Sequence, residues 1–132
     1  HRSDFIDFVD DYVDILFANE EEIRSLYAAD TFEKALIKTR QHVELAALTR
    51  GVQGSVVVEG EKTLIMNPEE TKRVVDTTGA GDSYAAGFLY GLTKGSDLEK
   101  CGYYGSLMAS EIIADLGARP RKELRAILEK AK

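Results

Sequence analysis

The first fifty residues alternate short apolar strands with segments of helical spacing, and this alternation constrains the fold more than any other feature. The spacing predicts a helix over 4–12, a buried strand over 14–18, helices over 19–27 and 32–41, and a strand over 43–49. Because parallel neighbours need a crossover connection, usually a helix, this alternation predicts parallel strands.

The middle of the chain changes to a two-stranded hairpin. Apolar strands over 55–59 and 62–66 flank Gly60-Glu61, and glycine in the first position suits a type II′ turn. The remaining segments are expected as a strand over 72–75 and helices over 80–93, 98–116 and 121–131. The sequence therefore predicts an α/β fold with one layered sheet of mixed strand direction.

Composition excludes several classes of function. The 132 residues hold 17 Lys and Arg against 23 Asp and Glu, a net charge of -6, so no basic surplus exists to neutralise nucleic acid. No apolar run approaches the roughly 18 residues of a membrane span. The chain starts at His1 without a signal-peptide pattern, and its single cysteine, Cys101, cannot form an internal disulfide. We expect a cytoplasmic protein that binds neither nucleic acid nor membrane.

The strongest chemical signal is the run Asp76-Thr77-Thr78-Gly79-Ala80-Gly81-Asp82, where a predicted strand leads into a predicted helix. A helix start presents unpaired backbone N–H groups and partial positive charge, and glycines let an anion approach them closely. Asp82 beside such a site fits a general base that activates a nucleophile attacking a phosphate. The alternative is an aspartate that only interacts with the helix start.

Other chemistries lack the residues that they need. The dinucleotide fingerprint fails because Tyr84 occupies the position of its third glycine, and no P-loop sequence is present. With only His1 and His42, the chain has little material for a catalytic triad or a zinc site.

The run 76–88 resembles the C-terminal signature of the ribokinase-like (PfkB) family of sugar and nucleoside kinases. Three further segments match family motifs in the right order: 19–22 (Asn-x-x-Glu), 49–54 (Thr-x-Gly-x-x-Gly) and 117–120 (Gly-Ala-x-Pro). The resemblance implies an ATP-dependent phosphotransferase that acts on a hydroxymethyl group of a sugar or nucleoside substrate. Within the family, the segment Gly102-Tyr103-Tyr104-Gly105-Ser106 is slightly more similar to the adenosine-kinase-like members.

The resemblance also implies roles for individual residues. Asp82 would be the catalytic base, and Gly79, Ala80 and Gly81 would form the backbone anion hole for the transferred phosphoryl group. Thr49, Gly51, Gly54 and Ser106 would lie on the nucleotide side.

Asn19 and Glu22 would organise Mg²⁺ and phosphate, through water. For this pair a capping arrangement at a helix start is the alternative. The small residues Gly102, Gly105 and Ser106 leave room either for the adenine ring or for close packing of another helix.

A monovalent cation, K⁺, is a further implied cofactor. The resemblance assigns it the carboxylate of Asp76 and the backbone carbonyls of Thr78, Ile112, Asp115 and Gly117. Arg121 stands where many relatives carry a small polar residue.

Family members are about twice as long, and their N-terminal part holds most of the substrate-binding residues and a lid sheet. Residues 1–132 would then be the C-terminal nucleotide-binding and catalytic half of a ribokinase-like kinase domain. The surface left by a missing half favours self-association. The alternative function is a nucleotide- or partner-binding module without turnover.

Overall fold

The computed structural model describes residues 6, 14–66 and 79–115. They divide into two compact units, one formed by 1–50 and 56–65 (the sheet unit) and one formed by 51–55 and 66–132 (the helix unit). The predicted strand over 72–75, the helix over 121–131 and nearly all of the helix over 4–12 lie outside the described residues.

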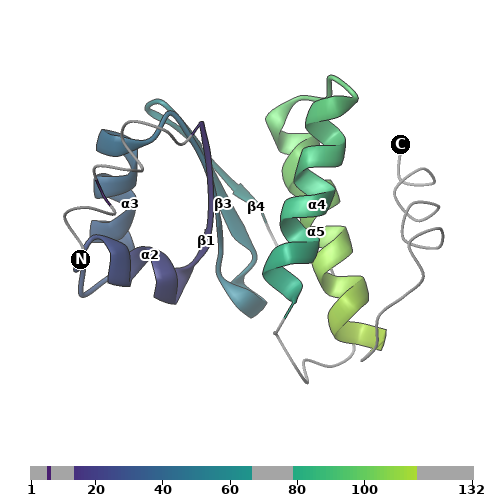
Figure 1. Cartoon of the computed structure of the whole chain (residues 1–132), viewed down its shortest axis with the longest axis horizontal. Coiled ribbons are helices and arrows are strands. Elements are labelled where there is room, and N and C mark those ends of the chain that lie inside the picture. Colours follow the sequence, from purple (N-terminus) through teal and green to yellow (C-terminus); the bar gives the residue numbers. More distant parts are fainter. Residues whose placement is uncertain (1–5, 7–13, 67–78, 116–132) are drawn as a thin grey trace. The chain divides into compact units, whose positions relative to one another are not determined.

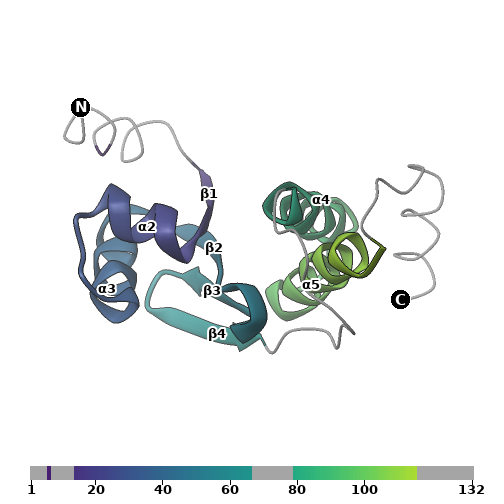
Figure 2. The same cartoon turned by 90° about the horizontal axis from the view of Figure 1, so that it is seen from below.

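Four strands form one sheet in the order β1-β2-β3-β4. The strands are β1 (Ile15–Asn19), β2 (Leu45–Thr49), β3 (Ser55–Glu59) and β4 (Lys62–Met66). β1 and β2 are parallel, as the alternation predicted. The crossover between them contains α2 (Glu20–Leu26) and α3 (Phe32–His42), which cover the same face of the sheet (Figures 1 and 2).

The hairpin supplies the antiparallel part of the sheet. Gly60 has φ +58, as the first turn position of a type II′ hairpin requires, and Ala28 is the only described non-glycine residue with positive φ. The N–H of Gly60 donates to the carbonyl of Glu44 at 2.9 Å, so the end of β3 lies beside the start of β2. The sheet is therefore of mixed direction, as expected.

The core of the sheet unit lies between the sheet and its two helices. Buried side chains of α2, α3, the residues that end these helices, and strands β2 and β3 form it: Ile23, Tyr27, Phe32, Ala35, Val43, Ala46, Leu48, Val56 and Val58. Ala47 and Val57, on the other face, are also buried, so β2 and β3 are interior strands buried on both faces. This explains why their sequences are continuous apolar runs rather than alternating ones.

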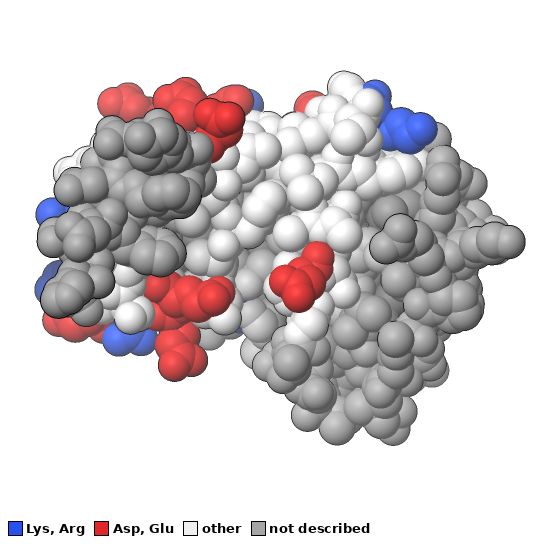
Figure 3. Space-filling model, in the orientation of Figure 1, with Lys and Arg blue, Asp and Glu red and all other residues white. Residues whose placement is uncertain are grey.

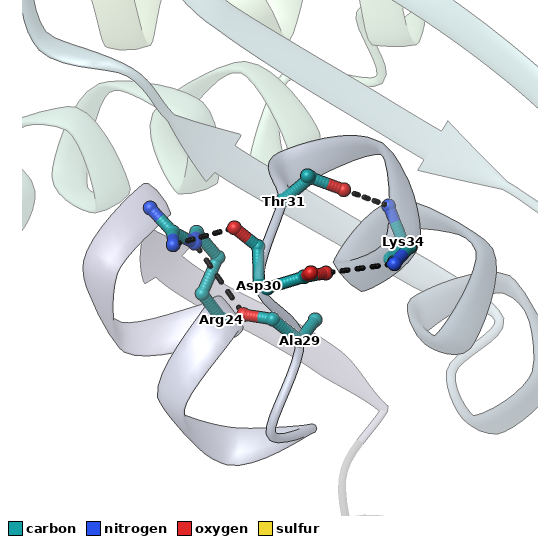
Figure 4. Close-up of polar contacts among 5 residues, drawn as sticks. All are labelled: Arg24, Ala29, Asp30, Thr31 and Lys34. Carbon is teal, nitrogen blue, oxygen red and sulfur yellow. Dashed lines mark hydrogen bonds and ion pairs between the residues drawn. The ribbon is translucent and has the colours of Figure 1, made fainter.

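The turn between α2 and α3 is held by polar contacts (Figure 4). Arg24 donates from its guanidinium to the carbonyls of Ala29 and Asp30, at 3.4 and 2.7 Å. Thr31 then begins α3 by accepting the N–H of Lys34 at 3.2 Å, and the Lys34 ammonium lies 2.9 Å from the Asp30 carboxylate. Side chains thus satisfy backbone groups that the chain reversal would leave unpaired.

At the other end of α3 the predicted strand over 43–49 begins two residues late, at Leu45. The N–H of Val43 still donates to the carbonyl of Thr39 at 2.9 Å, so this residue closes α3 instead.

The helix unit contains α4 (Ala80–Thr93) and α5 (Leu98–Asp115), which pack side by side as an antiparallel pair joined by a short loop (Figures 1 and 2). Glycines allow their close approach. A Cβ on Gly87 would lie 2.3 Å from the backbone oxygen of Tyr104, and one on Gly91 would lie 2.9 Å from the sulfur of Cys101. Within the described residues, no helix has the length and apolar character to cross a membrane.

Candidate functional site

The carboxyl ends of β1 and β2 bring two predicted site residues together. Asn19 and Thr49 end neighbouring parallel strands and are partners in the register of the pair. The next residues are joined too, because Arg50 Nε donates to Glu20 Oε1 at 2.7 Å. The Arg50 guanidinium also lies 4.0 Å above the centre of the Phe32 ring. Two motifs far apart in the sequence thus meet at one edge of the sheet.

Asn19 and Glu22 form a capping box at the start of α2. Asn19 Oδ1 accepts the N–H of Glu22 at 2.7 Å, and Glu22 Oε1 accepts the N–H of Asn19 at 2.8 Å. The structural alternative for this pair is therefore realised, and it uses one carboxylate oxygen of Glu22. The magnesium role stays a prediction.

The electrostatics of this edge favour a cation over an anion. Glu20, Glu21 and Glu22 occupy the first turn of α2, and only Glu20 carries an ion pair to Arg50 among the contacts described for these three. Figure 3 shows acidic side chains gathered near the start of α2 and at the opposite end of the sheet unit. Within the described residues, no three His, Cys, Asp or Glu side chains form a metal-binding group.

The predicted nucleotide segment continues into the helix unit as a short 3₁₀ turn, η1 (Gly51–Gln53). Gly51 is exposed, with φ +57, and its carbonyl accepts the N–H of Gly54 at 3.1 Å. Residues 51–53 are exposed, whereas Gly54 is buried. The segment is therefore a tight turn with an exposed start, and its binding role stays a prediction.

The start of α4 is open. Gly79 is its N-cap at φ +88, a conformation that non-glycine residues avoid, and no side chain in the described part of the chain caps it. A Cβ built on Gly79 or Gly81 meets none of the described residues within 4 Å. Gly79, Gly81 and Asp82 are exposed, so backbone N–H groups and a carboxylate lie side by side at the surface. Such an arrangement can bind an anion and remove a proton next to it.

The small residues of α5 have a packing explanation at two positions. A Cβ on Gly105 would lie 2.8 Å from the Tyr84 ring, and one on Gly102 would lie 3.0 Å from the Met66 side chain. The space beside these two glycines is therefore filled by side chains. Ser106 is buried, and its predicted place beside the nucleotide stays a prediction.

One buried contact of α4 was not predicted from the sequence. The Tyr84 hydroxyl and Ser55 Oγ share a buried hydrogen bond of 2.9 Å. Burial raises the pKa of Tyr84 to about 12, so the phenol is neutral at physiological pH. Two features of the sequence could have indicated this contact. A polar serine precedes three consecutive valines, and a large tyrosine lies in a helix rich in Gly and Ala.

Much of the predicted K⁺ site lies outside the described residues, including Asp76, Thr78 and Gly117. Ile112 and Asp115 belong to the last turns of α5. The cation site stays a prediction.

Comparison with known proteins agrees with this architecture. A relative from Archaeoglobus fulgidus, named an uncharacterized sugar kinase, is 40% identical over 105 residues, covering 80% of this chain and 42% of that protein. The adenosine kinase structure from Sinorhizobium meliloti is 41% identical with a TM-score of 0.91, covering 100% of this chain and 41% of that chain. The structure of Arabidopsis thaliana ribokinase complexed with ribose and ATP is 29% identical with a TM-score of 0.77, covering 94% and 43%.

The chain thus spans about two-fifths of the length of these relatives. The expected ribokinase-like fold of mixed strand direction is confirmed by the structural matches. A family model described as pfkB family carbohydrate kinase matches residues 3–124. Because this match runs through the β1–β2 edge, the hairpin and the open start of α4, the chain belongs to the pfkB family of carbohydrate kinases.

Proposed function

We propose that this chain is the nucleotide-binding and catalytic C-terminal half of an ATP-dependent kinase. The reaction would transfer the γ-phosphoryl group of ATP to a hydroxymethyl group of a sugar or nucleoside. The observation that carries the proposal is the open start of α4, where exposed backbone and the exposed Asp82 carboxylate stand together. Relatives named as sugar and adenosine kinases support it.

In this mechanism the backbone N–H groups of Gly79, Ala80 and Gly81 bind the charge that develops on the γ-phosphoryl oxygens. Donors fixed in place before the reaction stabilise the transition state without reorganisation. Asp82 accepts the proton of the substrate hydroxyl while the hydroxyl oxygen bonds to the γ-phosphorus and ADP leaves. The open space beside Gly79 and Gly81 fits a phosphate group, because no side chain of residues 14–66 or 79–109 lies within 4 Å of a Cβ built on either glycine.

The resemblance to the family assigns each cofactor its own set of residues. ATP would contact Thr49, Gly51, Gly54 and Ser106. Mg²⁺ would be held at the acidic start of α2 by Asn19 and Glu22 through water, and it would neutralise phosphate charge. Asp76 and Thr78 would contribute to a K⁺ site. The named relatives are kinases, and none supports the alternative of a binding module without turnover.

The decisive experiment is Asp82→Asn in the protein that carries this chain. Loss of a general base lowers kcat by roughly 10²–10⁴-fold, while KM for ATP should stay within about twofold. Asp97→Asn is the matched control. Asp97 also begins a helix, where its Oδ1 accepts the N–H of Lys100 at 2.8 Å, and asparagine caps equally well. Near-normal turnover of Asp82→Asn would remove this residue from the mechanism.

A second measurement tests the assignment of the chain to one half of a kinase domain. The 132 residues alone should release no acceptor-dependent ADP from ATP and Mg²⁺ with ribose, fructose, adenosine or other nucleosides. Correct positioning of the acceptor is worth roughly 7–11 kcal/mol of the barrier, and the residues expected to position it lie elsewhere. Turnover well above background with any of these acceptors would place the substrate site within this chain.

A further inference from the structure

We propose that Tyr84 and Ser55 act together as a positioning pair, whose buried hydrogen bond holds the first turn of α4 in the orientation that presents Asp82 to the substrate. This inference rests on the proposed role of Asp82 as the base. Neither residue belongs to the set that the sequence analysis assigned to the site.

The geometry of α4 places the side chains of Tyr84 and Asp82 on opposite sides of the helix. At 3.6 residues per turn, positions two apart point in nearly opposite directions. Tyr84 is accordingly buried at 2% exposure, whereas Asp82 is exposed. Any rotation of α4 about its axis that moves the tyrosine hydroxyl must therefore swing the carboxylate.

The tyrosine ring is already fixed by packing. It fills the space beside Gly105, where an added Cβ would lie 2.8 Å from a ring carbon, and it stacks on the Phe88 ring at 6.2 Å. A phenylalanine would make these same contacts. The hydroxyl adds one thing only, a directional bond to Ser55 Oγ at 2.9 Å.

The partner of that bond makes the pair relevant to the site. Ser55 directly follows Gly54, the end of the predicted nucleotide segment that begins at Thr49. Within the helix unit, the bond therefore joins the Gly51–Ser55 segment to the helix that carries the predicted anion hole. A buried hydroxyl adds little net stability, since its hydrogen bond mainly offsets lost hydration. Instead, this hydrogen bond fixes the position of the start of α4 relative to the Gly51–Ser55 segment.

The test is a double-mutant cycle in the protein that carries this chain, with Tyr84→Phe, Ser55→Ala and the double variant. We expect each single variant to lower kcat about tenfold, because a small misplacement of a catalytic group is costly. KM for ATP should stay within about twofold, and the double variant should be no slower than either single one.

Thr39→Val is the matched control. Thr39 is fully buried, and its hydroxyl donates to the carbonyl of Ala35 at 2.8 Å within α3, so this variant also deletes one buried hydrogen bond. It should lower the denaturation midpoint to a similar extent as Tyr84→Phe while leaving kcat unchanged. A role that is merely structural would give the two variants the same profile.

The outcomes separate this inference from the proposed function. If Tyr84→Phe and Ser55→Ala keep kcat within twofold while Asp82→Asn abolishes turnover, the positioning pair is wrong and the base remains. If their effects on kcat add in the double variant, the two residues do not act through their shared bond, and the inference is overturned. If Asp82→Asn is active, the proposed base fails whatever the pair does, and the inference falls with it.

Discussion

The starts of α2 and α4 are built in opposite ways. At α2 the side chains of Asn19 and Glu22 close the backbone N–H groups in a capping box, and three glutamates occupy the first turn. At α4 the N-cap is Gly79 at φ +88, and among the described residues no side chain caps it and a Cβ on Gly79 or Gly81 meets nothing within 4 Å. One helix satisfies two of its first N–H groups with its own side chains, and the other has no such cap among the described residues.

This difference indicates where a ligand anion can bind. A capped, acidic start such as that of α2 has fewer backbone donors to offer and repels phosphate, so it suits a cation. A glycine N-cap without a side-chain cap loses a few tenths of a kcal/mol of helix stability relative to a capped start. Packing within the helix unit offsets this loss, because Tyr84 and Gly87 of α4 are buried in contact with α5.

The largest expected effect comes from filling the open space at α4. Gly81→Ala places a methyl group where the anion should approach and should lower kcat about 10²-fold, the size of an impaired oxyanion donor. Alanine is the better helix former, so the same variant should gain up to about 1 kcal/mol of unfolding free energy. Kinetic assays and urea denaturation together measure the two opposite changes.

Ala86→Gly provides the reverse exchange at an exposed position of the same helix. It should cost about 1 kcal/mol of stability and leave kcat unchanged. If Gly81→Ala keeps full activity, the open start of α4 is not the phosphate site, and the contrast between the two helices has no functional meaning.

The second effect concerns the buried Tyr84 side chain, which anchors the open start of α4. Burial raises the pKa of Tyr84 from 10.0 to about 12, so the unfolded chain loses this proton first as pH rises. Its contribution to stability is therefore full below about pH 10 and declines towards about pH 12, by roughly 2–3 kcal/mol. The free energy of unfolding, measured in urea between pH 10 and pH 12, should fall more steeply with pH for the native protein than for Tyr84→Phe. Parallel curves for the two proteins would contradict the burial of this phenol.

The third effect separates capping from metal binding at α2. Glu22→Ala removes the capping box and should cost about 1 kcal/mol of unfolding free energy. Glu22→Gln keeps the box, since glutamine also accepts the N-cap N–H, but it loses the charge. If the pair also organises Mg²⁺, Glu22→Gln should raise the Mg²⁺ concentration for half-maximal activity more than it alters substrate KM. An unchanged magnesium dependence would leave capping as its whole role.

The smallest effect lies at the start of α3, a second capped helix. The Lys34 ammonium lowers the pKa of Asp30 by its hydrogen bond and charge, but this ion pair is fully exposed. Lys34→Ala should therefore leave the thermal midpoint unchanged at neutral pH. Thr31→Ala, which removes the cap beside it, should lower stability by about 1 kcal/mol. A larger loss from Lys34→Ala would show that surface charge, rather than capping, secures these helix starts.

Local signals were enough to predict most elements of the fold. Periodicity, turn glycines and capping residues located the strands β1–β4 and the helices α2–α5 within two residues, and the crossover rule predicted the parallel pair. The short 3₁₀ turn η1 was not predicted. The limits of local reasoning appear at Asn19 and Glu22. The same two residues satisfy both a capping pattern and a metal motif, and only coordinates show that the cap is made.

Contacts between distant segments could not be predicted in this way. Nothing in the sequence near Asn19 states that Thr49 will lie beside it, because strand register depends on the whole crossover. The Arg50–Glu20 ion pair has the same origin. Likewise, the stripe of small residues in α5 was compatible with a ring or a helix, until packing placed Tyr84 against Gly105.

The order of helices and strands, the family signature and the glycines at the start of α4 could all be predicted from the amino-acid sequence. These features depend on backbone conformation and spacing along the chain, which neighbouring residues fix. The hydrogen bond between Tyr84 and Ser55 and the pairing of Asn19 with Thr49 appear only in the folded chain. Such contacts form because buried polar groups and apolar faces must find partners across the fold, and which partner lies within reach is set by packing as a whole.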